Sequence, residues 1–366
     1  MNRGWRQELV RYAVILVISA ALASVLVMAK GESPWPLAKE VAHYAFGTRG
    51  GIATTLRWAS PIIIAAMGAL VASRVEVGNL GLEGQLYVAG LAAAVLGYSI
   101  SGLTPWLHKS IVLLGSVVTG GVFAMGPAFL YLRWGVNPIV SSLMMNYVAL
   151  WGTEFICYRF LMDDESVVPR MIATQEILPT ARFTSIMPPY NVDAGIYIGI
   201  ALCLIFFVLY KYTRLGYVLN VSGGNMAFAR YGGVNTNRIT YLVFFISGGL
   251  AGLAGATQIM GIHYMFINAF SVGLGWDGIL VGRLAMYQPI LVLVFGLFWG
   301  LLKNAGFIME RVSNADRWTV YVVQATMVLF VTADFHILPL LRALRRRLPG
   351  AKTPIAVAEV VEGERA

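Results

Sequence analysis

The sequence has few charged residues and almost no cysteine. Charged side chains make up 12% of the 366 residues, whereas soluble domains carry roughly 25%. Only two cysteines are present, and hydrophobic residues account for 58% of the chain, which is more apolar surface than a soluble globule can bury. These shortages exclude a cytosolic enzyme, a disordered chain and a secreted disulfide scaffold. They predict an all-α, polytopic membrane protein.

Catalytic signatures are also missing. The chain has no His-Glu-x-x-His, no Gly-x-Ser-x-Gly and no Gly-x-x-x-x-Gly-Lys-Ser/Thr phosphate loop. Cys157 and Cys203 lie in or beside apolar runs without metal-type spacing, which predicts small packing residues. Four histidines, mostly near the ends of apolar runs, are expected to pack at the interface: His43, His108, His263 and His336. The sequence therefore predicts no cofactor, no metal site and no P-loop ATPase activity of its own.

Long hydrophobic runs, in contrast, are abundant. A hydrocarbon core about 30 Å thick needs roughly 20 apolar helical residues. Nine runs could supply such helices: 12–29, 58–73, 85–101, 111–132, 136–157, 194–210, 239–262, 290–302 and 318–333. A weaker run over 270–286 carries two charges. Counting it, we expect about ten transmembrane helices in a domain over residues 12–338, and the first is a retained helix rather than a cleavable signal.

The distribution of positive charge favours this even number of crossings. Lys and Arg accumulate on the cytoplasmic side of membrane proteins. The stub 1–11, the segment 211–238 and the tail 339–366 are basic, and ten crossings place all three, with both termini, in the cytoplasm. The acidic loop 158–193 then lies outside. Loop 30–57 disagrees, because it is predicted outside yet carries more basic than acidic residues. We attribute the net charge of +9 to topology and not to nucleic-acid binding.

Polar groups interrupt the apolar runs at three places. Glu83 and Gln85 lie between two runs among three glycines, which predicts either a broken helix facing a water-filled path or an ordinary polar turn. Asn146, in the middle of the fifth run, needs a partner, either a neighbouring helix or a transported solute. Asp277, six residues before Arg283, lines a pathway or belongs to a structural ion pair, formed with Arg283 or through neighbouring spans.

Small residues recur at three- and four-residue spacing in the run 239–262. Gly248, Gly252 and Gly255 share this pattern beside Ser247. Because small residues let helix backbones approach closely, we expect tight helix packing at these positions rather than a ligand role.

The segment 211–238 contains a candidate surface helix. Asn225 precedes the short run 226–231, and two glycines follow it. Asn225 can cap a brief helix and glycine can end it. Such a helix would lie along the cytoplasmic surface and form a small protruding contact site for a partner protein. A solvated basic loop is the alternative.

Five motifs in order resemble those of a known family. They are Asn-x-Gly-x-Glu-Gly-Gln at 79–85, Leu-Met-x-Asn-Tyr at 143–147, Gly-x-Asn…Ala-Arg-Tyr-x-Gly at 223–233, Ser-Gly-x-Leu-Ala-Gly-Leu-Ala-Gly at 247–255 and Asp-Gly-Ile at 277–279. From about residue 50 to 335, the chain resembles bacterial ABC-transporter permeases for nucleosides and simple sugars, which are related to ribose-type and branched-chain amino-acid permeases.

The resemblance implies a helical subunit of the cell membrane that works in import. Its implied partners are a second permease, identical or different, two cytoplasmic ATP-binding subunits and an extracytoplasmic solute-binding protein. The helix that docks into the ATPase would be formed around Gly216, Asn225, Ala229, Arg230, Tyr231 and Gly233. Glu83, Gln85, Asn146 and Asp277 would line or shape the translocation path, and loop 158–193 would help receive the binding protein.

The sequence also departs from the family pattern. Asn220 stands where the family usually has Arg, Phe228 where a small residue is common, and 286–289 replaces a Gly-Arg-Asn-x-Pro turn. Pocket chemistry decides specificity and fold does not, so a nucleoside is the expected solute and a simple sugar such as ribose or galactose the alternative. From another class, an ion-coupled secondary transporter would use Asp277 and Glu83 to bind a proton or sodium.

Overall fold

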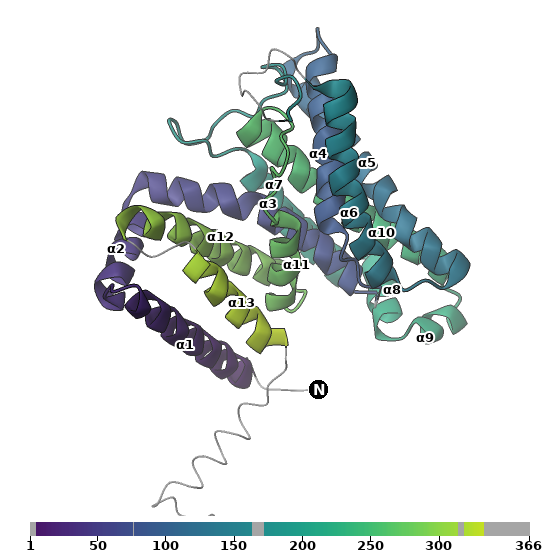
Figure 1. The fold of residues 1–366 in the computed structure, drawn as a ribbon. Coiled ribbons are helices and arrows are strands. Elements are labelled where there is room, and N and C mark those ends of the chain that lie inside the picture. The colour runs from purple at the N-terminus through teal and green to yellow at the C-terminus, as the bar shows by residue number, and fades with distance from the viewer. Residues whose placement is uncertain (1–4, 76, 163–171, 314–317, 333–366) are drawn as a thin grey trace, which may run out of the picture.

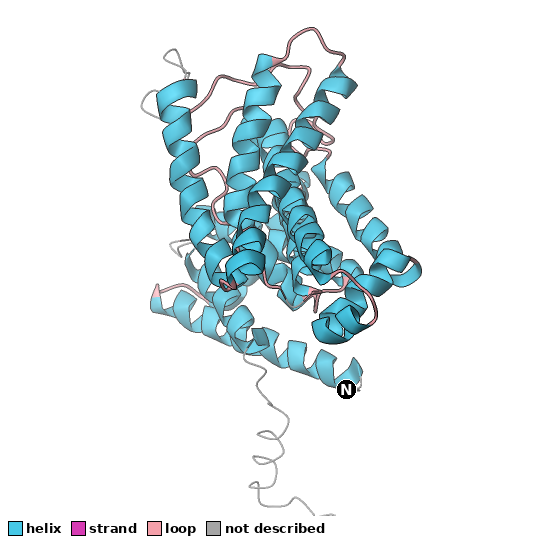
Figure 2. Ribbon diagram, turned by 90° about the vertical axis from the view of Figure 1, so that its right-hand side faces the viewer, coloured by secondary structure: helices cyan, strands magenta, loops and turns pink. Residues whose placement is uncertain are grey.

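The computed structural model describes residues 5–75, 77–162, 172–313 and 318–332 (Figure 1). Its regular elements within these ranges are all helical, joined by loops (Figure 2). They are α1 (Trp5–Ala29), α2 (Pro34–Gly47), α3 (Arg49–Ser73), α4 (Leu82–Ser99), α5 (Pro105–Trp134), α6 (Pro138–Ile156), η1 (Cys157–Leu161), α7 (Gly195–Tyr212), α8 (Arg214–Gly224), α9 (Met226–Tyr231), α10 (Thr236–Gln258), η2 (Ile259–His263), α11 (Leu274–Leu284), α12 (Pro289–Val312) and α13 (Trp318–Thr332).

Helices long and apolar enough to cross a bilayer confirm the prediction of an all-helical, polytopic membrane protein. Five candidate spans are present among the described residues: α3, α5, α7, α10 with η2, and α12. Residues Val17–Ala29 of α1 and the helix α2 are apolar enough only when taken together, across a bend of 111°, and the count is six if this bent pair is one span. Each of the nine strong hydrophobic runs coincides with a helix of the structure.

Three features differ from the sequence-based prediction. Loop 30–57 is largely helical, because α2 occupies it and α3 begins at Arg49 rather than at residue 58. α1 begins at Trp5 and takes in most of the expected stub 1–11. The weak run 270–286 yields only the 11-residue helix α11, about 16 Å long at 1.5 Å per residue, so it is a half-length helix and not a full span. The tail 339–366 and the acidic residues 163–165 lie outside the described residues.

Helices α3 and α10 form the centre of the molecule. α3 is buried without interruption from Ala59 to Ala72, and α10 from Ser247 to Gln258, as expected for helices that are apolar on every face. α10 packs against α5, α4 and α3, while α3 also contacts α11 and α12 (Figure 1). Helices α1 and α13 lie farther out and pack against each other, and α13 also packs against α12.

The small residues of α10 permit its close contacts. A Cβ atom added at Gly248, Gly252 or Gly255 would collide with the backbone carbonyl of Gly120, Ser116 or Leu86, respectively. The glycines therefore lie where α10 touches the backbones of α5 and α4, the geometry that small residues allow between membrane helices.

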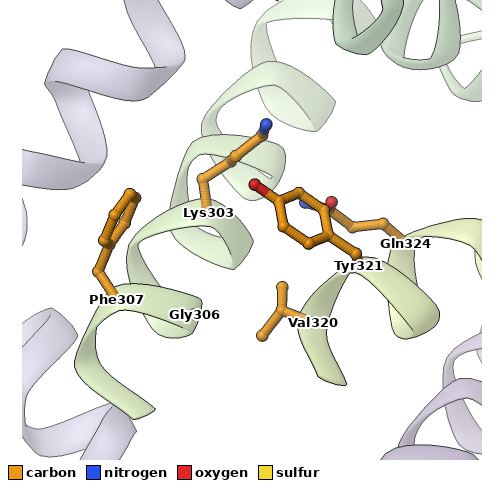
Figure 3. A pocket seen from close by; sticks show the side chains of 6 residues that line it. All are labelled: Lys303, Gly306, Phe307, Val320, Tyr321 and Gln324. Carbon is orange, nitrogen blue, oxygen red and sulfur yellow. The ribbon is translucent and has the colours of Figure 1, made fainter. Parts of the chain in front are cut away.

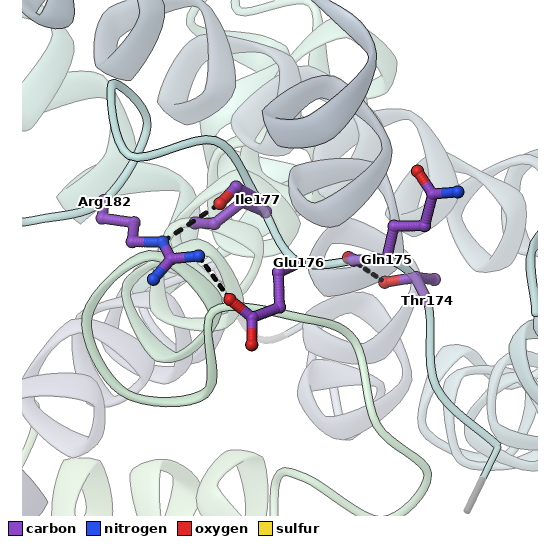
Figure 4. Close-up of polar contacts among 5 residues, drawn as sticks. All are labelled: Thr174, Gln175, Glu176, Ile177 and Arg182. Atoms are coloured by element: carbon purple, nitrogen blue, oxygen red, sulfur yellow. Dashed lines mark hydrogen bonds and ion pairs between the residues drawn. The ribbon is translucent and has the colours of Figure 1, made fainter. Parts of the chain in front are cut away.

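The described part of the long connection before α7, residues 172–194, is packed onto the helices at one end of the molecule. Leu178 N donates to the Gly97 carbonyl at the end of α4 (2.9 Å), and Phe183 N donates to the Met260 carbonyl in η2 (2.9 Å). Within the connection, Arg182 donates to the Ile177 carbonyl and pairs with Glu176 (Figure 4). Helices α8 and α9 lie at the opposite end (Figure 1).

Candidate functional site

Two interrupted helices meet inside the molecule. The irregular segment 77–81 leads into α4, and the segment 264–273, where Tyr264, Ala269 and Val272 have positive φ angles, leads into α11. Gly275 N, in the first turn of α11, donates to Glu83 Oε2 in the first turn of α4 (2.7 Å). A carboxylate is favourable at a helix N-terminus, where the free N–H groups lie. Glu83 therefore caps the start of α11 across the helix boundary.

An amide pair holds the interruption before α4. Asn79 and Gln85 exchange two side-chain hydrogen bonds of 3.0 Å. Asn79 Nδ2 also donates to Ser247 Oγ in α10 (2.9 Å), and this hydroxyl donates to the Gly68 carbonyl in α3 (2.9 Å). All of these side chains are buried, so the pair replaces the hydrogen bonds that the broken backbone loses.

Asn146 ties α6 to the same interruption. Its Oδ1 accepts from Gly84 N and its Nδ2 donates to the Leu80 carbonyl, each at 2.8 Å. Ser142, one turn earlier, accepts from Leu80 N at 3.0 Å. In this conformation both the oxygen and the nitrogen of the Asn146 side-chain amide therefore bind protein backbone. Of the two partners that the sequence allowed, a neighbouring helix and a transported solute, the structure has the first.

Asp277 pairs with a lysine that sequence reasoning missed. Its Oδ2 lies 2.7 Å from Lys303 Nζ, and its Oδ1 accepts from Trp299 Nε1 at 2.9 Å. Lys303 is only 5% exposed, and a buried charge of this kind requires a counter-charge. Pairing of Asp277 with Arg283 is wrong, because Arg283 is exposed and its guanidinium lies over the Tyr287 ring. The four-residue spacing of Trp299 and Lys303 on one face of α12 was the available signal.

A small pocket lies beside this ion pair, between α12 and α13. Its lining residues are Lys303, Gly306, Phe307, Val320, Tyr321 and Gln324 (Figure 3). The Lys303 ammonium lies 5.3 Å from the centroid of the Tyr321 ring. The free volume is about 10 Å³, which accommodates one water molecule and excludes a sugar or a nucleoside in this conformation.

Helices α8 and α9 carry the candidate coupling residues. Asn225 Oδ1 accepts from Phe228 N (2.9 Å) and caps α9, which ends at Tyr231 and is followed by Gly232. Arg230 and Tyr231 point outward, Tyr231 with 93% of its surface exposed, whereas Ala229 is buried beneath them.

Two glycines shape the same region. A Cβ at Gly216 would collide with the Leu209 carbonyl of α7, so this glycine permits the sharp turn between α7 and α8. Gly233 has a φ of +84°, a conformation that favours glycine. The result is a short, capped helix whose Arg230 and Tyr231 side chains face outward.

Relatives with described functions align along nearly the whole chain. A guanosine ABC transporter permease protein, NupP of Bacillus subtilis, is 26% identical over 91% of this chain and 96% of its own. A nucleoside ABC transporter permease protein, NupB of Lactococcus lactis, is 24% identical over 94% and 97%. A glucose ABC transporter permease protein, TsgB13 of Haloferax volcanii, is 25% identical over 88% and 87%.

Family membership follows from a match over residues 51–332 to the family described as "Branched-chain amino acid transport system / permease component". This match confirms the resemblance found in the motifs. The alternative hypothesis of an ion-coupled secondary transporter is therefore wrong. It also confirms that ATP hydrolysis belongs to another subunit. The chain belongs to this permease family and is a multi-pass ABC-transporter permease of the cell membrane.

Proposed function

We propose that this permease imports a nucleoside delivered by an extracytoplasmic binding protein. The observation that carries the proposal is the pair of relatives described as guanosine and nucleoside permeases, which align over more than nine tenths of the chain. A simple sugar is the second candidate, because the sequence identity to a glucose permease, 25%, is about as high as that to the two nucleoside permeases.

Uptake by the reconstituted transporter separates these two candidates. The proteoliposomes would contain the permease, its ATP-binding subunits and its binding protein. ATP would be enclosed in the lumen, which corresponds to the cytoplasm in this orientation. Labelled guanosine is expected to accumulate, and excess unlabelled uridine or adenosine tests the breadth of nucleoside recognition. Competition by glucose or ribose alone, with nucleosides inert, would contradict the nucleoside proposal and favour the sugar.

We further propose ten crossings with both termini in the cytoplasm. Four hydrogen bonds between ends of helices and connecting segments support this arrangement. Arg74 at the end of α3 hydrogen-bonds to Asn220 in α8 and to Tyr287 after α11, so these three ends share one side. The connection 172–194 binds the ends of α4 and α10 at the other side. In this proposal, segment 264–273 and the half-length helix α11 together form the eighth crossing, which keeps the number of crossings even.

In this mechanism α9 receives the motion of the ATPase. Its short length, its Asn225 cap and its outward-facing Tyr231 make it a rigid lever. Closure of the ATP-bound dimer would move α8 and α9 and switch the helices between an outward-open and an inward-open arrangement. The permease performs no covalent chemistry. Transport has a direction because the partners and the solute bind the outward-open and inward-open arrangements with different affinities.

A proline at Gly233 tests the lever. Proline fixes φ near −65° and removes the N–H group, whereas Gly233 has a φ of +84° and donates to the Arg230 carbonyl. Gly233→Pro should abolish uptake with insertion intact. Gly102→Pro is a matched control, because Gly102 has a φ of +82° and open space around it at the other end. Undiminished uptake with Gly233→Pro would contradict the assignment.

We propose that Glu83, Gln85, Asn146 and Asp277 shape the translocation path by holding its wall. Each carries a hydrogen bond or ion pair that fixes the start of α4 or α11. Glu83 is the member that remains partly exposed, and Glu83→Gln should therefore change the affinity for the solute. Gln85 is fully enclosed, so Gln85→Leu should change the amount of folded protein instead. The opposite pattern would contradict this division.

A further inference from the structure

The junction around Arg74, at the cytoplasmic end of α3 in the proposed topology, joins four elements through one side chain. Arg74 Nη1 donates to Asn220 Oδ1 in α8 and Nη2 donates to the Tyr287 carbonyl after α11, each at 2.9 Å. The guanidinium lies 4.7 Å from the centroid of the Tyr210 ring at the end of α7. Gly223 of α8 packs so closely that a Cβ there would collide with the Arg74 carbonyl.

The same junction has unused hydrogen-bonding groups. Among the described residues, three buried side-chain atoms at this junction have no hydrogen-bond partner: Arg74 Nε, Tyr210 Oη and Ser222 Oγ. These three belong to the residues of the junction or their immediate neighbours. A buried polar atom without a partner raises the free energy of the conformation that contains it. These three groups are free to accept or donate hydrogen bonds to other protein groups in a second arrangement of the junction.

The turn after α11 is also unusual. Met286 and Tyr287 have φ angles of +48° and +52°, and residues other than glycine enter this region at an energetic cost. Arg74 binds the carbonyl of Tyr287 within this turn. α11 itself carries Asp277, which is joined to Lys303 of α12. A displacement at the turn is thus passed directly to the half-length helix inside the membrane.

We infer that Arg74 transmits the movement of α8 and α9 to α11 by exchanging hydrogen-bond partners between two arrangements. The inference rests on the proposed docking of α9 to the ATPase. Arg74 is a positioning residue, because it acts through α11 and touches no solute. In the second arrangement its Nε group and the hydroxyls of Tyr210 and Ser222 gain partners, while the bond to Asn220 or to Tyr287 is given up.

The number of solute molecules imported per ATP hydrolysed tests this role. In proteoliposomes containing the whole transporter, Arg74→Met should leave ATP hydrolysis within about twofold of wild type and lower uptake about tenfold, a typical coupling between sites. Arg74→Lys should recover part of the ratio, because one ammonium can donate to Asn220 or Tyr287. Arg283→Met is the control, since Arg283 contacts the Tyr287 ring without a bond to α8, and should keep the wild-type ratio.

A second variant keeps the test decisive if Arg74→Met fails to assemble. Asn220→Leu retains Arg74 and its bond to Tyr287 and removes the link from Arg74 to α8, together with the 3.4 Å hydrogen bond from Asn220 Nδ2 to the Tyr210 carbonyl, so it should also lower the ratio. Assembled variants with the wild-type ratio would overturn the role of Arg74. Absence of ATP-driven uptake in the wild-type transporter would instead contradict the proposed function, so the two failures can be told apart.

Discussion

The molecule has two polar junctions that differ in how completely their groups are paired. Inside the membrane domain, Glu83, Asn146 and the Asn79–Gln85 pair place their polar groups on neighbouring backbone or side chains. At the Arg74 junction, by contrast, three buried polar atoms have no hydrogen-bond partner in the part of the chain that the structure describes.

The difference indicates which part of the permease is fixed and which part moves. A satisfied buried network favours one arrangement strongly, because every alternative leaves a polar group unpaired. An incompletely paired junction has a smaller free-energy difference between its present arrangement and alternative ones. We infer that the paired groups at the starts of α4 and α11 keep their contacts, and that rearrangement concentrates at the Arg74 junction, where α3, α8 and the turn after α11 meet.

The largest effect is expected at the buried ion pair of the fixed region. Lys303→Met leaves the Asp277 carboxylate without its counter-charge and should destabilise the folded permease by about 3–5 kcal/mol. Thermal unfolding in detergent measures this loss.

Two comparisons make the ion-pair test specific. The double variant Lys303→Met with Asp277→Asn should be more stable than Lys303→Met alone, because no charge remains buried. Arg283→Met removes an exposed charge and should leave the unfolding temperature unchanged. A double variant that is no better than the single one would show that the pair is not what holds α11 to α12.

A second, smaller effect is expected where α10 crosses α5. Gly252→Ala places a methyl group against the Ser116 carbonyl, a clash with backbone that should cost about 1–3 kcal/mol. Gly152→Ala is the matched control, because no described atom lies within 4 Å of its new methyl group. Equal stability of the two variants would mean that the contact between α10 and α5 yields easily, against the idea of a fixed region.

The smallest effect is expected at Asp193, in the connection that leads to α7. Its Oδ1 accepts from Gly195 N at 2.8 Å, and its carboxylate packs against Gly261 of η2. Burial raises the pKa of Asp193 to about 6, although Gly195, Arg57 and Ser60 partly oppose this rise. Since this pKa lies above the value in the unfolded chain, the stabilisation is complete below about pH 4 and is lost as the pH rises through about 6.

Hydrogen exchange measures this pH dependence. After correction for intrinsic exchange rates, amides near residues 192–196 should exchange faster at about pH 7.5 than near pH 5, and Asp193→Asn should remove the difference. Glu176→Gln, which changes an exposed carboxylate paired with Arg182, should retain it. Protection that is independent of pH in the wild-type protein would contradict the buried-carboxylate account.

The sequence predicts the helices better than their contacts. Apolar runs locate the helices because burial in lipid or protein requires them, and Asn225 marks the start of α9 because its side chain suits a cap. α2 and the first turns of α3 were missed, since Lys39, Arg49 and Arg57 interrupt the apolar pattern there.

Long-range partners could not be predicted in the same way. Asn79 binds Ser247, and Arg74 binds Asn220 and Tyr287, across more than a hundred residues of chain. Only the packing of α3, α8 and α10 brings these groups together. Asp277 requires a counter-charge, yet the identity of Lys303 depends on how α12 is rotated against α11.

Cysteine labelling of α9 tests the central claim most directly. Tyr231→Cys places a thiol on the most exposed side chain of α9, while Cys157 and Cys203 are buried. A membrane-impermeant maleimide should label it only in inside-out vesicles, and the bound ATPase subunit should protect it. Trp106→Cys, an exposed position at the start of α5, should label only from the outside. Labelling of Tyr231→Cys from outside, or labelling that the ATPase leaves unchanged, would contradict the account.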